Sequence, residues 1–371
     1  MTEYAWFAAL CDDDYEFLGV PDPALQSSWD HCRSIVLRAE QNGFDNVLLP
    51  SGYALGIDAT AFASAIAVET SRIKLLLAVR LGELVVPQLA RQIATVQHIA
   101  GGRLVINAIS SDVPGETLSS EARYQRTTES IAVLRTLLQG KRADFDGQFI
   151  TAHVDAPRIA VQHPHDPVVY FGGLSEAARQ CAAESCDVFL MWPDTRERMS
   201  EVLREMNDRA ATFGRTLRYG WRSHVIVRET EAEARAAASR LLSRLDVETG
   251  AAIRAKSLDS ASAGVARQSE LRDAADEDGY VERHLWAGVG RARSGAGIAI
   301  VGDPDQVAGK LRELRDAGID TFILSGYPHL AECDLVARHV LPQLQPRTGS
   351  IVAGDRRTRG SERSKNERFS R

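Results

Sequence analysis

The sequence lacks any long hydrophobic run. No apolar stretch in its 371 residues approaches the roughly 18–20 residues that a membrane-crossing helix needs. The N-terminus turns acidic at Cys11-Asp-Asp-Asp14, whereas an export signal would begin with basic residues followed by apolar ones. We therefore expect a cytoplasmic protein with no membrane partner.

Cysteine is scarce and unpatterned. The five cysteines form an odd set, and no two have the CxxC spacing. This usage fits reduced thiols in a cytoplasm better than a disulfide framework. We expect no metal site, because the pair His163-Pro-His165 is more typical of solvated histidines. The sequence also has no HExxH, GxSxG or paired-carboxylate motif, so nothing supports a metallopeptidase, an α/β-hydrolase or a glycosidase.

Outside its last 25 residues the chain has an excess of negative charge. The formal net charge is −6, yet the last 25 residues carry eight Lys/Arg against three Asp/Glu, which leaves about −11 on the rest. An acidic body without a basic stripe argues against binding of nucleic acid. The basic tail, 347–371, is poor in apolar residues, and we expect it to be disordered.

Short apolar strands alternate with amphipathic helices along the rest of the sequence. This alternation is typical of a parallel α/β fold. About eight such units close naturally into a (β/α)8 TIM barrel, and an open sheet is the alternative. The expected strands are Tyr4 to Leu10, Phe44 to Pro50, Ile73 to Val79, Leu104 to Ser110, Pro167 to Gly172, Val188 to Trp192, Tyr219 to Val227 and Thr321 to Ser325.

We predict one barrel domain, 1–346, with two insertions. The first, about 141–165, contains a hairpin signal at Asp146-Gly147. The second, about 248–294, is polar and comes late in the chain, where a long excursion is usually a functional loop or lid.

The predicted ends of the strands are rich in polar residues, and in a βα barrel the active site lies at those ends. Arg222 and His224 are two residues apart on the seventh strand, so they share one face and need a polar partner. In "YFGGLSEAA" a strand runs into two glycines and a serine that begins a helix, which is a phosphate-binding geometry or an ordinary tight turn. The glycine-rich stretch "GVGRARSGAG" has no preceding strand, so it is not a dinucleotide fingerprint.

Several motifs, in this order, resemble those of the alkanesulfonate monooxygenases, within the bacterial luciferase-like flavin monooxygenase superfamily. They are "RQIAT...GGRLVIN", "YFGGLSEAA", "HVIVRETEAEA", "LWAGVGRARSGAG" and "SGYPHL". The resemblance spans about residues 4–344. It implies an enzyme that uses reduced FMN as a co-substrate together with O2, and that oxygenates a small organosulfonate to an aldehyde and sulfite.

The resemblance also implies partners and site residues. The partners are a separate NAD(P)H-dependent flavin reductase, a small anionic substrate and a second copy of the chain, as a homodimer or homotetramer. The expected flavin-binding residues are Asn107, Ser110, Ser111, Tyr124, Gly173, Leu174 and Ser175. The expected substrate-binding and catalytic residues are Trp192, Arg222, His224, Arg293 and Tyr327, with Arg293 brought in by closure of the lid.

The sequence departs from the family's pattern near the flavin. Cys11 stands where the family has a histidine, Gly56 or Leu55 where it has a cysteine, Ser119-Ser120 where it has Asp-His, and Leu174 where it has a serine. These changes favour one alternative, in which the same oxygenation serves a biosynthetic substrate. A non-catalytic flavin-binding subunit and a deazaflavin-using relative are two further alternatives.

Overall fold

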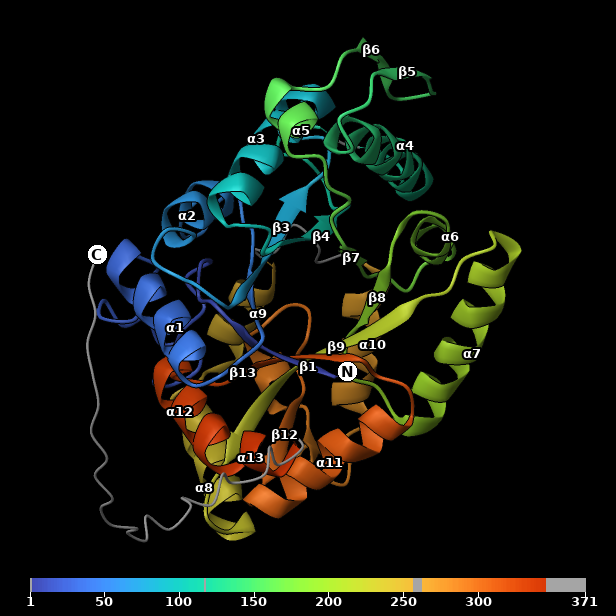
Figure 1. Cartoon of the computed structure of the whole chain (residues 1–371). Coiled ribbons are helices and arrows are strands. Elements are labelled where there is room, and N and C mark those ends of the chain that lie inside the picture. Colours follow the sequence, from blue (N-terminus) through green and yellow to red (C-terminus); the bar gives the residue numbers. More distant parts are fainter. Residues whose placement is uncertain (1, 117, 256–261, 345–371) are drawn as a thin grey trace, which may run out of the picture.

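The computed structural model describes residues 2–116, 118–255 and 262–344. Parallel strands form a closed ring in these residues, in the order β1-β2-β3-β4-β7-β8-β9-β13 and back to β1 (Figure 1). The eight strands of the ring confirm the predicted TIM barrel within the described residues and exclude the open sheet. Their bounds are β1 (Glu3–Phe7), β2 (Asn46–Leu49), β3 (Lys74–Arg80), β4 (Leu104–Ile109), β7 (Val169–Phe171), β8 (Val188–Met191), β9 (Arg218–Val227) and β13 (Thr321–Ser325).

Helices surround the ring, as Figure 1 shows. Serine, threonine or aspartate caps many of their first turns, for example Ser28, Ser119 and Thr230. Apart from α9 and α10, whose bounds are given below, the helices of the described residues are α1 (Trp29–Gln41), α2 (Ala59–Ile66), α3 (Val86–Ile99), α4 (Ser120–Leu138), α5 (Arg158–Gln162), α6 (Glu176–Ser185), α7 (Arg196–Thr212), α8 (Glu231–Leu242), α11 (Pro304–Asp316), α12 (His329–His339) and α13 (Leu341–Leu344). No described helix is long and apolar enough to cross a membrane.

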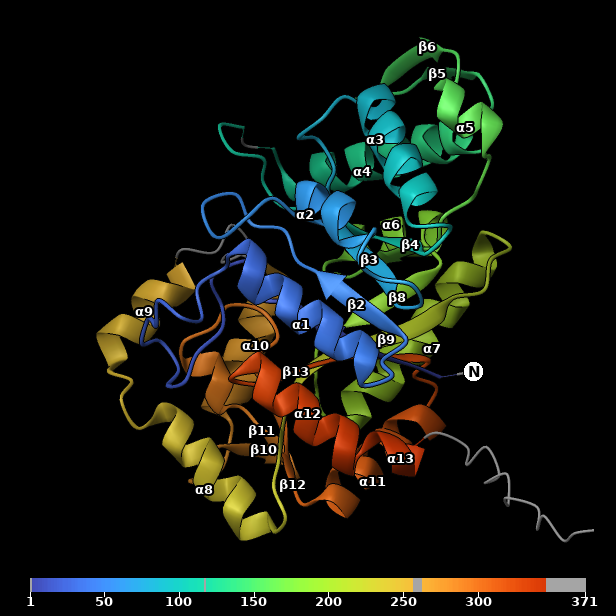
Figure 2. The ribbon, with the colours of Figure 1, turned by 60° about the vertical axis from the view of Figure 1, so that its left-hand side comes forward.

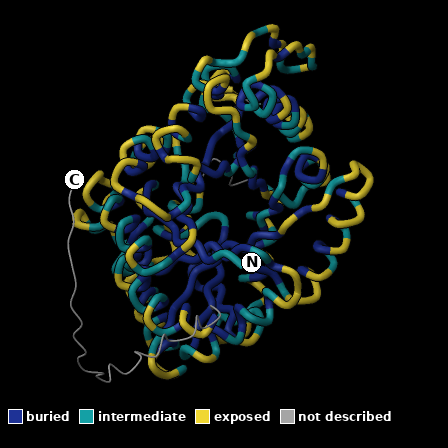
Figure 3. Tube along the Cα trace, in the orientation of Figure 1, coloured by how far each residue is buried: buried dark blue, intermediate teal, exposed yellow. Residues whose placement is uncertain are grey.

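The strands are buried on both faces, which is why they are almost continuously apolar (Figure 3). One cluster fills the barrel interior and includes Phe7, Leu48, Leu76 and Tyr170. A larger cluster packs between the strands and the helices and includes Leu49, Ile35 and Phe62. The barrel is therefore a packed core, and polar side chains at its mouth stand on a rigid frame.

Two excursions leave the ring. The segment 141–165 carries the antiparallel hairpin of β5 (Ala143–Asp146) and β6 (Thr151–Val154), followed by α5. The segment between α8 and β12 (Ala299–Gly302) carries α9 (Val247–Ala255), α10 (Ala263–Asp273), β10 (Tyr280–Glu282), β11 (Leu285–Trp286) and a 3₁₀ turn, η1 (Gly288–Arg291). The predicted tail, 347–371, lies outside the described residues.

The strand β9 is long enough to serve both the ring and the second excursion. Its residues Gly220 to His224 pair with β13, while His224 to Val227 pair with β12. Figure 2 shows α9 beside the blue loop that follows β1, and a Cβ placed on Gly19 of that loop would lie 2.8 Å from Leu245. The second excursion, whose described residues 243–255 and 262–298 are hereafter called the lid, thus packs against the loop after β1.

Replacing Leu49 with alanine should destabilise the barrel by about 2–5 kcal/mol, because the side chain is fully buried between β2 and the helices. Urea unfolding followed by circular dichroism measures the change. The matched control is Val68→Ala, since Val68 is 72% exposed and should have almost no effect. Equal shifts in the two variants would contradict this account of the core.

Candidate active site

Arg222 and His224 lie side by side on the inner face of β9 and share one partner. In register they stand opposite Ile323 and Ser325 of β13. The Arg222 Nη2 donates to the Ser325 Oγ at 2.9 Å, and the Ser325 Oγ lies 2.8 Å from the His224 Nδ1. Ser325 therefore links the guanidinium to the imidazole, a role that its place at the end of a strand alone did not reveal.

These contacts fix the tautomer of His224. Its Nε2 lies 3.2 Å from the backbone oxygen of Ala296 in the lid, and a carbonyl oxygen only accepts, so Nε2 carries the hydrogen. The Nδ1 then accepts from the Ser325 hydroxyl. Burial holds the pKa of His224 well below its usual value, with the charges of Arg222 and Arg293 adding to the effect. His224 is thus neutral at physiological pH and ties β9 to the lid.

Arg222 is a buried cation without an anionic partner. It is 3% exposed, and no carboxylate of the described residues forms an ion pair with it. Its Nη1 also donates to the backbone oxygen of Ser223 at 2.6 Å, and its guanidinium carbon lies 4.3 Å from the centroid of the Phe7 ring. Burial, and then the positive charge of Arg293, lowers the pKa of Arg222 to about 9. The group still carries a charge at neutral pH, and within the described ranges that charge has no ion-pair partner.

Arg293 reaches the same place from the lid. Its guanidinium lies over the same Phe7 ring, 5.4 Å from the centroid, and its Nη1 donates to the Tyr327 hydroxyl at 3.0 Å. Burial alone would lower its pKa, but Tyr327 and Asp13 together raise it above the usual value. The Tyr327 ring stacks on His224 with centroids 5.0 Å apart. The structure therefore brings together four of the five predicted substrate residues, namely Arg222, His224, Arg293 and Tyr327.

Trp192, the fifth of these residues, packs against the lid. A Cβ on Gly264 of α10 would lie 2.9 Å from its ring, and one on Gly295 would lie 3.2 Å away. Beside it, Arg267 of α10 makes two hydrogen bonds to Asp194, at 2.7 and 2.8 Å. The lid is therefore closed over the ends of β8 and β9, and it shields the arginines from solvent.

The predicted flavin residues lie on or just after the neighbouring strands β4 and β7, apart from Tyr124, which is on α4. Asn107 is on β4 opposite Tyr170 of β7, and the Ser110 Oγ accepts from the Thr127 hydroxyl at 2.7 Å. The Ser111 Oγ is buried and makes no hydrogen bond in the described part of the chain. An orphaned hydroxyl of this kind is suited to a polar ligand.

The turn after β7 forms a narrow backbone cradle. A Cβ on Gly173 would lie 2.6 Å from the Ala178 Cβ and 3.5 Å from the Tyr124 hydroxyl, so Tyr124 and Gly173 adjoin. Ser175 caps α6 by accepting from the Ala178 N–H at 3.2 Å, and Leu174 lies between the glycine and this cap. Backbone N–H groups at a helix N-terminus fit the phosphate of a flavin nucleotide.

The structure describes the surroundings of two of the departures, Gly56 and Cys11. Gly56 has a φ of +73°, and a Cβ there would lie 1.8 Å from the backbone oxygen of Leu10, so no side chain fits at this position. Burial, with Asp13 next, raises the pKa of the Cys11 thiol to about 12. Cys11 is therefore protonated at neutral pH and is not an activated nucleophile.

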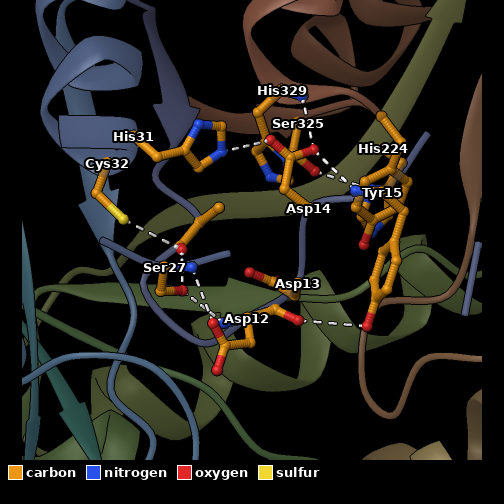
Figure 4. A network of polar contacts seen from close by, with 12 residues as sticks. Asp12, Asp13, Asp14, Tyr15, Ser27, His31, Cys32, His224, Ser325 and His329 are labelled. Atoms are coloured by element: carbon orange, nitrogen blue, oxygen red, sulfur yellow. Dashed lines mark hydrogen bonds and ion pairs between the residues drawn. The ribbon is translucent and has the colours of Figure 1, made fainter. Parts of the chain in front are cut away.

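Three consecutive aspartates follow β1, and the sequence did not identify them as site residues. Figure 4 shows them with Ser27, His31 and His329. Asp14 is fully buried, with Oδ2 2.9 Å from the His31 Nε2 and Oδ1 2.9 Å from the backbone nitrogen of His329. The His329 Nδ1 also lies 3.0 Å from Oδ1, as an ion-pair contact rather than an aligned hydrogen bond. Asp14 thereby joins the loop after β1 to α1 and to the start of α12.

Comparison of the sequence with known protein families identifies the family of this chain. The chain matches the luciferase-like monooxygenase family over residues 17–321, so it belongs to that family. The resemblance seen in the motifs is thus confirmed.

Two relatives carry the name sulfoquinovose monooxygenase. The one from Novosphingobium aromaticivorans is 61% identical over 92% of this chain and 96% of its own length. The one from Agrobacterium fabrum is 47% identical over 93% of this chain and 90% of its own length.

Solved structures share the fold at low identity. The EDTA monooxygenase of Chelativorans sp. BNC1 matches with a TM-score of 0.74 and 17% identity, over 93% of each chain. A riboflavin lyase matches with a TM-score of 0.76 and 17% identity, over 93% of this chain and 91% of the other. At this identity the likeness concerns the barrel alone.

Asp14 should make stability depend on pH in the acid range. Burial alone would raise its pKa, but His329 and the hydrogen bonds from His31 and His329 hold it below the usual value. A carboxyl with a lowered folded pKa stabilises the fold above its unfolded pKa of about 4, and this stabilisation is lost as the pH falls further.

We therefore expect Asp14→Asn to be less stable than the natural chain at neutral pH by about 3 kcal/mol, the typical cost of breaking a buried pair. The difference should shrink below about pH 4, because Asp14 of the unfolded natural chain then binds a proton that the folded chain does not yet bind, which removes the stabilisation progressively. Unfolding midpoints in urea across the acid range test this. A difference that stays constant through that range would show that the charge of Asp14 contributes nothing.

Proposed function

We propose that the chain is the oxygenating component of a two-component monooxygenase that acts on a small organosulfonate. It takes reduced FMN from a separate NAD(P)H-dependent flavin reductase and uses O2 to release an aldehyde and sulfite. Sulfoquinovose, a hexose that carries a sulfonate group, is the favoured substrate because the two named relatives are sulfoquinovose monooxygenases. The assembly is a homodimer or homotetramer.

One observation carries the proposal: the buried Arg222 guanidinium has no carboxylate partner within the described ranges. A charge that has been desolvated and left unpaired is costly, so its retention calls for an anionic ligand. A guanidinium presents a planar fork of donors, which suits the oxygens of a sulfonate. Arg293, over the same aromatic ring, supplies a second fork from the lid.

The flavin fits the residues at the ends of β4 and β7. The Gly173 cradle and the N-terminus of α6 would hold the phosphate, with Tyr124 beside them. Asn107 and the hydroxyls of Ser110 and Ser111 would meet the rest of the cofactor. The bound flavin would supply the activation of O2.

The chain's own residues bind, orient and shield the substrate. Arg222 and Arg293 would hold the sulfonate oxygens, and Tyr327 would add a hydroxyl donor. Neutral His224 is oriented by Ser325 and holds Ala296 of the lid in place. The closed lid, fastened by Arg267 to Asp194, would keep water away from the reacting carbon.

Replacing Arg222 with methionine should have two opposite effects. The kcat/KM for sulfite release should fall by about 30-fold or more, as expected when loss of one partner of a buried charge pair costs about 2–5 kcal/mol. The free chain should become more stable, because an uncompensated buried charge has been replaced by an apolar side chain of similar length. Sulfite assays with reduced FMN and O2, together with thermal unfolding, measure both quantities.

The control for this variant is Arg240→Met, an exposed arginine of α8 that pairs with Glu16 and should change neither quantity. An Arg222→Met chain that is less stable and still releases sulfite would mean that Arg222 is a structural residue.

Replacing Gly173 with alanine should weaken FMN binding about tenfold, because a Cβ 2.6 Å from Ala178 must push apart the turn and the start of α6. Anaerobic titration with reduced FMN, followed by protein fluorescence, gives the dissociation constant. Gly309→Ala is the matched control, since a Cβ there has no neighbour within 4 Å. Unchanged affinity in the Gly173 variant would exclude this cradle as the phosphate site.

A further inference from the structure

Two of the three aspartates after β1 hold their loop in a fixed shape. Asp12, with a φ of +50°, accepts from the Ser27 N–H at 2.8 Å and from the Gly56 N–H at 3.1 Å. Asp14 accepts from His31 and from the His329 N–H, as described above. Both carboxylates therefore fasten the loop to neighbouring segments of the chain, and the backbone of Asp13 between them is held in place.

Asp13, the residue between them, uses only one of its oxygens. Its Oδ2 pairs with the Arg293 Nη1 at 2.5 Å. Its Oδ1 is buried and has no hydrogen-bond partner among the described residues. The side chain as a whole is 14% exposed. A carboxylate oxygen that has lost its water and gained no donor is unfavourable, so the empty acceptor requires an explanation.

The charges of Arg222, Arg293 and Asp13 sum to a single positive charge, and His224 between them is neutral because burial and the two arginines lower its pKa. Tyr327 and Ser325, which contact these groups, are uncharged at neutral pH. His329, beside Phe7 and Tyr327, is paired separately with Asp14. The site therefore matches an anion of charge −1, such as a sulfonate, and would leave a dianion half unpaired.

We propose that Asp13 makes this site selective for hydroxylated monoanions. Its Oδ2 cancels one of the two guanidinium charges, and its Oδ1 accepts a hydrogen bond from a hydroxyl group of the substrate. The proposal rests on the proposed function, in which the two arginines hold a sulfonate. It adds the reason why a sugar sulfonate is preferred to a simple alkanesulfonate, namely that only the sugar satisfies the free oxygen of Asp13.

The preference for a hydroxylated sulfonate follows from the free-energy cost of leaving the Asp13 Oδ1 without a hydrogen bond. A plain alkyl chain placed against Oδ1 would keep water out and offer no donor, so the desolvation cost of the carboxylate oxygen would remain. A hydroxyl group removes that cost and forms a charge-assisted hydrogen bond. Sites built to pair with a hydroxyl discriminate strongly against analogues that lack it, for the same reason.

The test is anaerobic calorimetry with the full chain, in the presence and absence of saturating reduced FMN. The ligands are 3-hydroxypropane-1-sulfonate, propane-1-sulfonate, which differs only by the hydroxyl, and 3-hydroxypropyl phosphate, a dianion at about pH 8. The natural chain should bind the hydroxylated sulfonate about tenfold more tightly than the plain one. Asp13→Ala should lose this preference, and Asp13→Asn should gain about tenfold in affinity for the phosphate ester relative to the sulfonate.

Glu16→Gln is the matched control, because it removes one negative charge from the same loop at an exposed position paired with Arg240. It should keep the natural selectivity, and circular dichroism should show that all variants are folded. If the natural chain binds neither sulfonate, the proposed function fails and the role of Asp13 fails with it. If it binds both sulfonates equally, or if Asp13→Ala keeps the preference, only the role of Asp13 is wrong.

Discussion

A buried cation, Arg222, that has no carboxylate partner in the described part of the chain is the constraint on which the mouth of this barrel depends. Arg222 loses its water on folding and receives in return one carbonyl, one hydroxyl and the face of Phe7. These contacts are weak substitutes for a carboxylate. Burial lowers the pKa of the neighbouring His224, and the charge of Arg222 adds to this effect, so the imidazole is neutral where it meets Ser325 and the lid. The buried guanidinium thus contributes to the protonation state of the residue beside it.

The second arginine, Arg293, is held by residues from two other segments of the chain. The lid carries Arg293, while the loop after β1 supplies Asp13, and the end of β13 leads into Tyr327. These segments are remote in the sequence and meet only because β1 and β13 are adjacent strands of the ring. The aspartates on either side of Asp13 hold its backbone, so the charge balance of the site rests on residues that touch no ligand.

The sequence predicts most of this fold because each barrel strand is buried on both faces and appears as a short apolar run followed by a capped helix. It also places Arg222 and His224 on one face, since strand periodicity needs no tertiary information. The contacts of Asp13, Asp14 and Ser325 could not be predicted from the sequence. Asp14 meets His329 across 315 positions of sequence, and only the register of β1 against β13 brings them together. Local pattern carries no signal for such contacts, and loop aspartates are usually solvated.

The length of β9 has a consequence for the spacing of the two arginines. Its first half pairs with β13 and carries Arg222 and His224, while its outer half pairs with β12, the strand through which the chain returns from the lid. The lid also contacts His224 through the backbone oxygen of Ala296. Arg222 stands on β9 and Arg293 on the segment that rejoins it, so a shift of β12 along β9 would alter the separation of the two guanidinium groups.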